Sequence, residues 1–301
     1  MESSNRYSKL MEIRHLGISN NYVSIRNMTV GVIGLGRIGS RVAQQLARMG
    51  FGTIIVIDKG MVQTKHVQSC AYYREHIGLS KVQATRLSIH EINPDVHVIG
   101  ETLDLLNTFE LDFLEEVILQ ANIASHALEE LTSLDRKEHL KGKSGIADLL
   151  ISCLDSLASR KAMNTICMRS GISLFNSQMH ENGKEATINL VIPGQTACLE
   201  CIHEKAQASS HPSDQHDSIS SKCDAPGVAM MVSGQVVQSA LQFLLKFGTV
   251  NAGFRYRSQA DSKLDDVDTY TPSKEYLCFP TEPYALCTEP RCREKAQMAS
   301  V

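Results

Sequence analysis

The chain has 301 residues, of which 43% are hydrophobic, and its formal net charge is −3. This length and composition predict one globular domain with at most an appended lobe, and the small negative charge gives no basis for binding nucleic acid or an anionic membrane surface. Residues 228–247 form the most apolar stretch, which three glutamines and one lysine interrupt. This pattern predicts a buried helix, with no membrane insertion.

Cysteine usage indicates the compartment. The chain has nine cysteines, and its first residues lack the apolar run and small-residue cleavage site of a secretory signal. In a reducing compartment, thiols serve metal binding or catalysis and do not form disulfides. We therefore expect a cytoplasmic protein.

A strand, a glycine-rich turn and a helix follow one another near the N-terminus. Residues 29–33 are a short apolar run, residues 34–39 read Gly-Leu-Gly-Arg-Ile-Gly, and an amphipathic segment continues to residue 49. A second apolar run at residues 53–58 ends in an aspartate. This order predicts a βαβ unit, and hence parallel strands.

The alternation of strands and helices continues along the chain. Ser80 opens a helical pattern, residues 96–100 read as a strand, and residues 148–154 read as a strong strand. We predict an α/β fold with a Rossmann-like, parallel-rich sheet flanked by helices. Charge and alanine at residues 124–145 indicate a surface helix and loop.

We divide the chain into an N-terminal helical extension, a central domain and a C-terminal segment. The extension covers residues 1–27 and the domain residues 28–260, with a mobile polar loop at about residues 202–226. The remaining segment, residues 261–301, is polar and punctuated by proline.

The glycine turn predicts nucleotide binding. Gly34, Gly36 and Gly39 allow a tight turn, so the following helix can present its N–H groups to phosphate. Asp58 ends the next strand and is placed to accept ribose hydroxyls. A purely structural turn and an NAD-dependent dehydrogenase fit these residues too, so both alternatives stay open here.

A later carboxylate favours ATP. Asp155 and Ser156 follow a strand, at the edge where open α/β sheets bind ligands, and a carboxylate there suits Mg²⁺ held with ATP phosphates. The alternative is an aspartate that only caps a loop. Lys81 lies in the first turn of its helix, where a lysine can contact phosphate or simply face solvent.

Two cysteine pairs predict a zinc site. Cys198 and Cys201 form a C-x₂-C pair, and Cys287 and Cys292 form a C-x₄-C pair. Four thiolates suit tetrahedral zinc, which would staple the C-terminal segment to the domain. A redox pair at the first two cysteines is the alternative, although it leaves the second pair unexplained.

Cys223 lies between the two pairs, just before an apolar helix. A thiol near a helix N-terminus has a lowered pKa and is more nucleophilic, whereas the neighbouring Asp224 works in the opposite direction. A catalytic thiol and an incidental cysteine both remain open from local sequence.

In order along the chain, these motifs resemble the ThiF-type adenylating enzymes, in particular those that activate the ubiquitin-fold modifier. The resemblance is carried by YSKLM, GLGRIGS, GLSKVQA, INPDV, SCLD with Arg160, IPGQTACLEC, Cys223, QFLLKFGTV and CTEPRC. It implies a homodimer that uses Mg-ATP to adenylate the modifier's C-terminal glycine. It also implies a thioester on Cys223, transfer to a conjugating enzyme, and zinc on the four paired cysteines.

The chain departs from this family at several positions. Arg37 stands where the family has glycine, Ser69 where it has a catalytic arginine, and Ser156 and Asp104 where it has asparagine. Loss of an arginine that neutralises phosphate charge costs several kcal/mol in a transition state, and Arg37 is a candidate replacement. We therefore keep three functions open: an activating enzyme, a catalytically impaired zinc-stabilised scaffold, and a sulfur-carrier adenylyltransferase.

Overall fold

The computed structural model describes residues 7–8, 22–126, 147–180, 185–202 and 226–257. The helices and strands are η1 (Tyr22–Asn27), β1 (Thr29–Ile33), α2 (Gly39–Met49), β2 (Thr53–Ile57), α3 (Thr64–Ser69), η2 (Arg74–His76), α4 (Lys81–Ile92), β3 (His97–Glu101), α5 (Thr108–His126), β4 (Leu149–Ser152), α7 (Leu157–Ser170), β5 (Leu174–Met179), β6 (Glu185–Val191), α9 (Pro226–Leu245) and β7 (Gly253–Arg257).

These strands form one sheet in the order β3-β2-β1-β4-β5-β6-β7. The pairs from β3 to β5 are parallel, and β6 and β7 are added antiparallel. The predicted α/β fold with a parallel-rich sheet is confirmed. Strand order reverses between β1 and β4, and the crevice at the carboxyl ends of such a strand pair is where open α/β sheets bind ligands.

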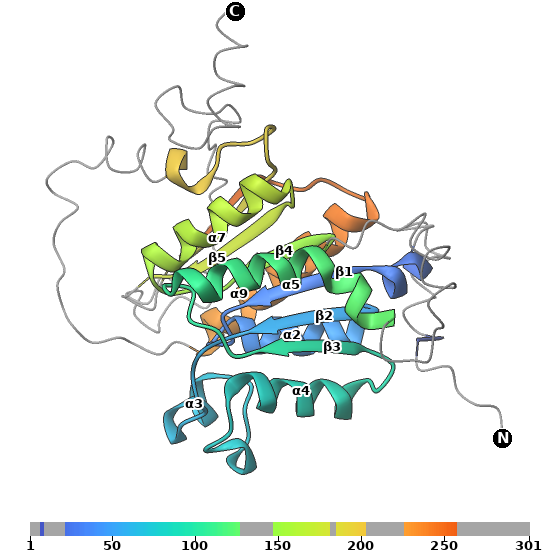
Figure 1. Cartoon of the computed structure of the whole chain (residues 1–301), viewed down its shortest axis with the longest axis vertical. Helices are drawn as coiled ribbons and strands as arrows, with labels where there is room; N and C mark the ends of the chain where they lie inside the picture. Colours follow the sequence, from blue (N-terminus) through green and yellow to red (C-terminus); the bar gives the residue numbers. More distant parts are fainter. Residues whose placement is uncertain (1–6, 9–21, 127–146, 181–184, 203–225, 258–301) are drawn as a thin grey trace, which may run out of the picture.

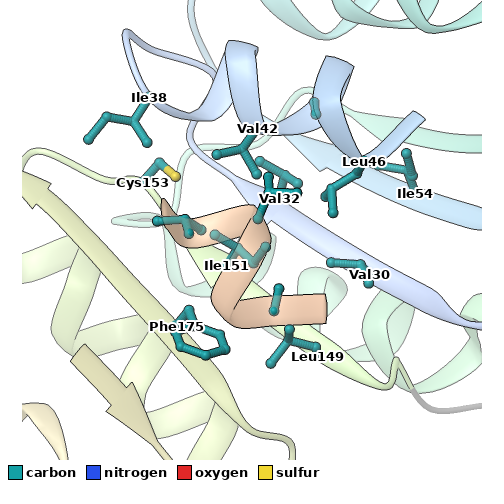
Figure 2. Packing of buried hydrophobic residues seen from close by; sticks show 14 of the residues in the cluster. Val30, Val32, Ile38, Val42, Leu46, Ile54, Leu149, Ile151, Cys153 and Phe175 are labelled. Carbon is teal, nitrogen blue, oxygen red and sulfur yellow. The ribbon is translucent and has the colours of Figure 1, made fainter. Parts of the chain in front are cut away.

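Helices cover both faces of the sheet (Figure 1). Helices α2, α4 and α9 bury their apolar residues against one face, and α5 and α7 against the other. Because β1 is buried on both faces, it reads as a continuous apolar run. Figure 2 shows Val30 and Val32 of β1 gathered with Leu149 and Ile151 of β4 in the first of these two cores.

The buried helix predicted at residues 228–247 is confirmed as α9. By length and composition alone it would pass for a membrane span. However, it packs against α2, β5 and β6, and Val232, Val236 and Ala240 are buried in the core. Its apolar composition is therefore explained by its place in the fold.

The helix at Ser80 is also confirmed. The Ser80 hydroxyl accepts a hydrogen bond of 3.0 Å from the main-chain N–H of Gln83, which caps the N-terminus of α4. Helix α5 was not predicted, because acidic residues mask the apolar face that Leu114 and Ile118 bury. The segment expected at residues 124–145 lies outside the described residues beyond residue 126. The same holds for most of the N-terminal extension, for nearly all of the polar loop and for the C-terminal segment.

Candidate active site

Predicted ligand-binding residues from distant parts of the sequence meet in one pocket. Its volume is about 270 Å³, and it opens at the carboxyl ends of β1, β2 and β4. The predicted residues that line it are Gly34, Gly36, Asp58, Lys81, Asp155 and Ser156. Two further predicted residues lie beside it: Gly39 is packed inside the glycine turn, and Arg37 lines an adjoining cleft.

The three glycines of the turn have different roles. Gly34 has a φ of +91°, which side chains rarely adopt, and a Cβ on Gly39 would lie 1.8 Å from the carbonyl oxygen of Gly34. These two glycines are therefore required by the fold of the turn. A Cβ on Gly36 would meet no atom within 4 Å. Gly36 faces the open pocket, so the space above it is available to a ligand.

Asp58 is held rigidly beside the turn. One carboxylate oxygen accepts a hydrogen bond of 2.7 Å from the Leu35 N–H, and the other accepts one of 2.6 Å from the Gly60 N–H. The Lys81 ammonium lies 3.7 Å from the same carboxylate, and both side chains are mostly buried. Asp58 thus fixes the glycine turn and the lysine relative to each other, with the positive charge lining the pocket.

Asp155 and Ser156 follow β4 and line the same pocket. The Ser156 hydroxyl accepts a hydrogen bond of 3.1 Å from the Ser159 N–H and so caps the N-terminus of α7. Asp155 lines both the pocket and the adjoining cleft. Arg160 lies close by, where burial lowers the pKa of its guanidinium and the charge of Asp155 raises it again in part. A carboxylate in this position is suited to hold Mg²⁺ together with phosphate oxygens.

The segment after β3 contributes residues that sequence reasoning did not assign to the pocket. Leu103, Leu105 and Leu106 provide apolar walls, and Asp104 forms an ion pair of 3.0 Å with Lys59 at the rim. The pair is largely exposed. Their position in the sequence could have identified them, because each follows the carboxyl end of a strand in a parallel sheet.

Ser69 is turned into the protein. Its side chain is buried, and its hydroxyl donates a hydrogen bond of 3.1 Å to the Lys65 carbonyl oxygen. Arg41 brings a positive charge to its main chain, because Nη1 of Arg41 donates to the carbonyl oxygens of Ser69 and Arg37 at 2.8 and 2.5 Å. Arg41 therefore ties the end of α3 to the glycine turn.

Half of the predicted zinc site is within the described residues. Cys198 and Cys201 are fully buried, and their sulfur atoms lie 3.7 Å apart. Two thiolates bound at about 2.3 Å to tetrahedral zinc lie about 3.8 Å apart, so the spacing fits this metal. In the described ranges, no three metal-binding side chains form a cluster, so these two cysteines need partners from elsewhere. Cys223, Cys287 and Cys292 lie outside the described residues.

Three of the remaining cysteines are buried in the core: Cys70, Cys153 and Cys167. Burial raises the pKa of each of these thiols above its usual value. Because the thiolate is the reactive form, a raised pKa makes these cysteines poor nucleophiles.

Comparisons with known proteins agree with this architecture. The model of the ThiF family matches residues 7–278. The chain is 33% identical over 268 residues to ubiquitin-like modifier-activating enzyme 5 of Dictyostelium discoideum, a match that covers 86% of this chain and 63% of that protein. It is 31% identical over 301 residues to the Gallus gallus protein of the same name, covering 98% of this chain and 66% of that protein. The chain thus spans slightly less than two thirds of the length of these relatives.

Solved structures show the same fold at lower identity. A crystal structure of E. coli MccB with succinimide matches with a TM-score of 0.61 and 19% identity, covering 85% of this chain and 69% of that one. A crystal structure of E. coli MccB with ATP matches with the same TM-score and coverage at 18% identity. From the strand order, the glycine turn and the family match together, the chain belongs to the ThiF family.

Proposed function

We propose that this chain activates a ubiquitin-like modifier, specifically the ubiquitin-fold modifier, by using Mg-ATP to adenylate its C-terminal carboxylate. The observation that carries the proposal is the pocket, in which the glycine turn, Asp58, Lys81 and Asp155 line one space at the switch point of the sheet. The names of the relatives and the ATP in one MccB structure support the same activity. The carboxylate at Asp155 favours ATP over a nicotinamide cofactor, because it supplies a place for Mg²⁺.

The proposed first step transfers the adenylyl group. An oxygen of the acceptor carboxylate attacks the α-phosphorus of ATP, the bond from that phosphorus to the bridging oxygen breaks, and pyrophosphate leaves. Lys81 and the N–H groups after the glycine turn would stabilise the negative charge that develops on the phosphates. Asp155 would hold Mg²⁺, which neutralises the phosphate charge when bound. Asp58 would accept the ribose hydroxyls through the lone pairs that its main-chain contacts leave free.

The proposed second step moves the acyl group to sulfur. The Cys223 thiolate attacks the carbonyl carbon of the adenylate, the bond from carbon to the AMP oxygen breaks, and AMP leaves. We further propose that Cys198, Cys201, Cys287 and Cys292 bind one zinc ion. A homodimer, delivery to a conjugating enzyme and a cytoplasmic location complete the proposal.

A second candidate is a catalytically impaired relative that acts as a zinc-stabilised scaffold. One observation favours it: Ser69 stands where the resemblance places an arginine, and its hydroxyl bonds to a main-chain oxygen of its own helix. A sulfur-carrier adenylyltransferase would use the same pocket on a different acceptor. The acceptor therefore has to be identified by experiment.

The test is acceptor-dependent exchange of labelled pyrophosphate into ATP, with ubiquitin-fold modifier, other small modifiers and sulfur carriers as separate acceptors. Exchange with the ubiquitin-fold modifier supports the proposal. Exchange with a sulfur carrier alone would mean that the acceptor is a sulfur carrier and not the ubiquitin-fold modifier. Folded protein that exchanges with no acceptor would establish the scaffold candidate instead.

A further inference from the structure

A second, smaller cleft adjoins the nucleotide pocket. It is lined by Arg37, Ile38, Cys153, Asp155, Ser177 and Met179, and its volume is about 10 Å³. That is room for about one water-sized atom. Cys153 and Asp155 line both cavities, so the residues after β4 separate them. The cleft thus shares part of its wall with the pocket proposed to bind the nucleotide.

Ser177 contributes a polar atom to this cleft that is not paired with any described residue. The residue lies on β5, it is only 1% exposed, and its hydroxyl oxygen has no hydrogen-bond partner within the part of the chain that the structure describes. Buried hydroxyls in native proteins are nearly always hydrogen-bonded, so an unpaired one requires an explanation. A polar atom of a ligand in the cleft would supply the missing partner.

Arg37 contributes the positive charge. Arg37 lines the small cleft, whereas the cations that line the nucleotide pocket are Lys59 and Lys81. The main-chain oxygen of Arg37 accepts a hydrogen bond of 2.5 Å from Arg41, which fixes the backbone that carries the side chain. A guanidinium is always charged, and its planar donors match a carboxylate.

The charge of Asp155 sets a condition on what can bind here. A second carboxylate next to Asp155 is repelled unless a cation lies between or beside them. Arg37 lines the same cleft and satisfies that condition. A guanidinium binds an anion more strongly than a neutral acceptor, so this arginine favours an anion.

We propose that this cleft is the subsite for the acceptor's terminal carboxylate, which Arg37 binds through its charge and Ser177 through a hydrogen bond. One carboxylate oxygen fills the cleft and accepts from the Ser177 hydroxyl. The other carboxylate oxygen is left free to attack the α-phosphorus of ATP, which would lie in the nucleotide pocket on the other side of Asp155. This inference rests on the proposed function, because it assigns the second substrate of the same site.

The test compares acceptors that differ only in terminal charge. The probes are ubiquitin-fold modifier with its free carboxylate and the same protein as the C-terminal amide, titrated calorimetrically into the full chain with Mg²⁺ and saturating AMPCPP. The variants are Arg37→Gln and Ser177→Ala. The control is Arg48→Gln, which removes the same charge from an exposed position on α2.

We expect the unmodified chain and Arg48→Gln to bind the acid about tenfold more tightly than the amide, as a charge-assisted contact requires. Arg37→Gln should bring this ratio close to one, and Ser177→Ala should weaken binding of the acid several-fold. AMPCPP affinity should stay unchanged in every variant. Ser177→Ala should also be as stable to urea as the unmodified chain, since it removes a hydroxyl that bonds to none of the described residues.

Other results separate the two levels of the proposal. If the unmodified chain catalyses exchange but Arg37→Gln keeps its preference for the acid, the proposed function stands and the subsite is wrong. If Arg37→Gln instead loses AMPCPP affinity, Arg37 belongs to the nucleotide pocket and the subsite is again wrong. A clear loss of stability in Ser177→Ala would overturn the role of Ser177. If the unmodified chain exchanges with no acceptor, the proposed function fails, and the subsite fails with it.

Discussion

Gly39→Ala should lower the free energy of unfolding, whereas Gly36→Ala should keep the fold stable and weaken ATP binding. At Gly39 the new Cβ would lie 1.8 Å from the Gly34 carbonyl oxygen, whereas at Gly36 it would meet nothing within 4 Å. Real Cβ contacts are essentially never shorter than 3.0 Å, so the backbone of the turn would have to move by more than 1 Å in Gly39→Ala. Neither end of this contact is a flexible side chain that could move aside.

Overpacking against a rigid neighbour typically costs about 1–3 kcal/mol, and we expect Gly39→Ala to reach or exceed the upper end because the neighbour is backbone. Gly36→Ala should leave the free energy of unfolding unchanged or raise it by up to about 1 kcal/mol, because alanine has fewer unfolded conformations. It should nevertheless weaken ATP binding, since the methyl group occupies space at the pocket surface.

Two assays separate these effects: urea unfolding for stability and calorimetric titration with Mg-ATP for binding. Each variant is the control for the other. If Gly39→Ala were as stable as the unmodified chain, the close approach inside the turn would be wrong. If Gly36→Ala bound ATP normally, the turn would not be the phosphate site.

Three further predictions address Lys81, His66 and the zinc site. Lys81→Met should weaken ATP binding about tenfold or more in calorimetry, because it removes the ammonium that lines the pocket; unchanged affinity would place the phosphates elsewhere. Burial, followed by Lys81 and Lys65, lowers the pKa of His66, whose Nδ1 accepts a hydrogen bond of 2.9 Å from the Gln63 N–H. The neutral form is therefore favoured in the fold, so its contribution to stability is complete above the unfolded pKa of about 6.5 and is lost as pH falls through the lowered folded pKa. Between about pH 8 and pH 5, the free energy of unfolding measured in urea should thus fall more in the unmodified chain than in His66→Asn. An equal decrease in both proteins would refute this role of His66. Metal analysis of protein purified without chelator should find about one zinc per chain and little in Cys198→Ser; a metal-free unmodified chain would contradict the zinc proposal.

The sequence predicted those parts of the site that depend on local patterns. The apolar run before Gly34 identifies β1, and the one before Asp58 identifies β2. Once both strands are parallel, their carboxyl ends must meet at one edge of the sheet. Asp155 follows a strand about 100 residues later in the chain and is expected at the same edge for the same reason; this strand, β4, is the neighbour of β1.

Other parts could not be read from the sequence because they depend on tertiary packing. Nothing near Arg41 in the sequence indicates that its guanidinium bonds to the main-chain oxygens of Arg37 and Ser69. Ser177 looks like an ordinary strand residue, and only the fold reveals that its hydroxyl is buried beside Asp155 and unpaired among the described residues. Helix α5 is not evident from the sequence, because acidic residues are interspersed with the apolar ones and only the fold shows that Leu114 and Ile118 are buried.

Isotope transfer tests most directly whether the acceptor's own carboxylate attacks ATP. The C-terminal carboxylate of ubiquitin-fold modifier is labelled with the heavy isotope of oxygen and incubated with the full chain and Mg-ATP, and the AMP that is released is analysed by mass spectrometry. If the carboxylate attacks the α-phosphorus and a thiol then displaces AMP, each AMP molecule carries one heavy oxygen. AMP without the label, or no AMP from folded protein, would contradict the proposed reaction.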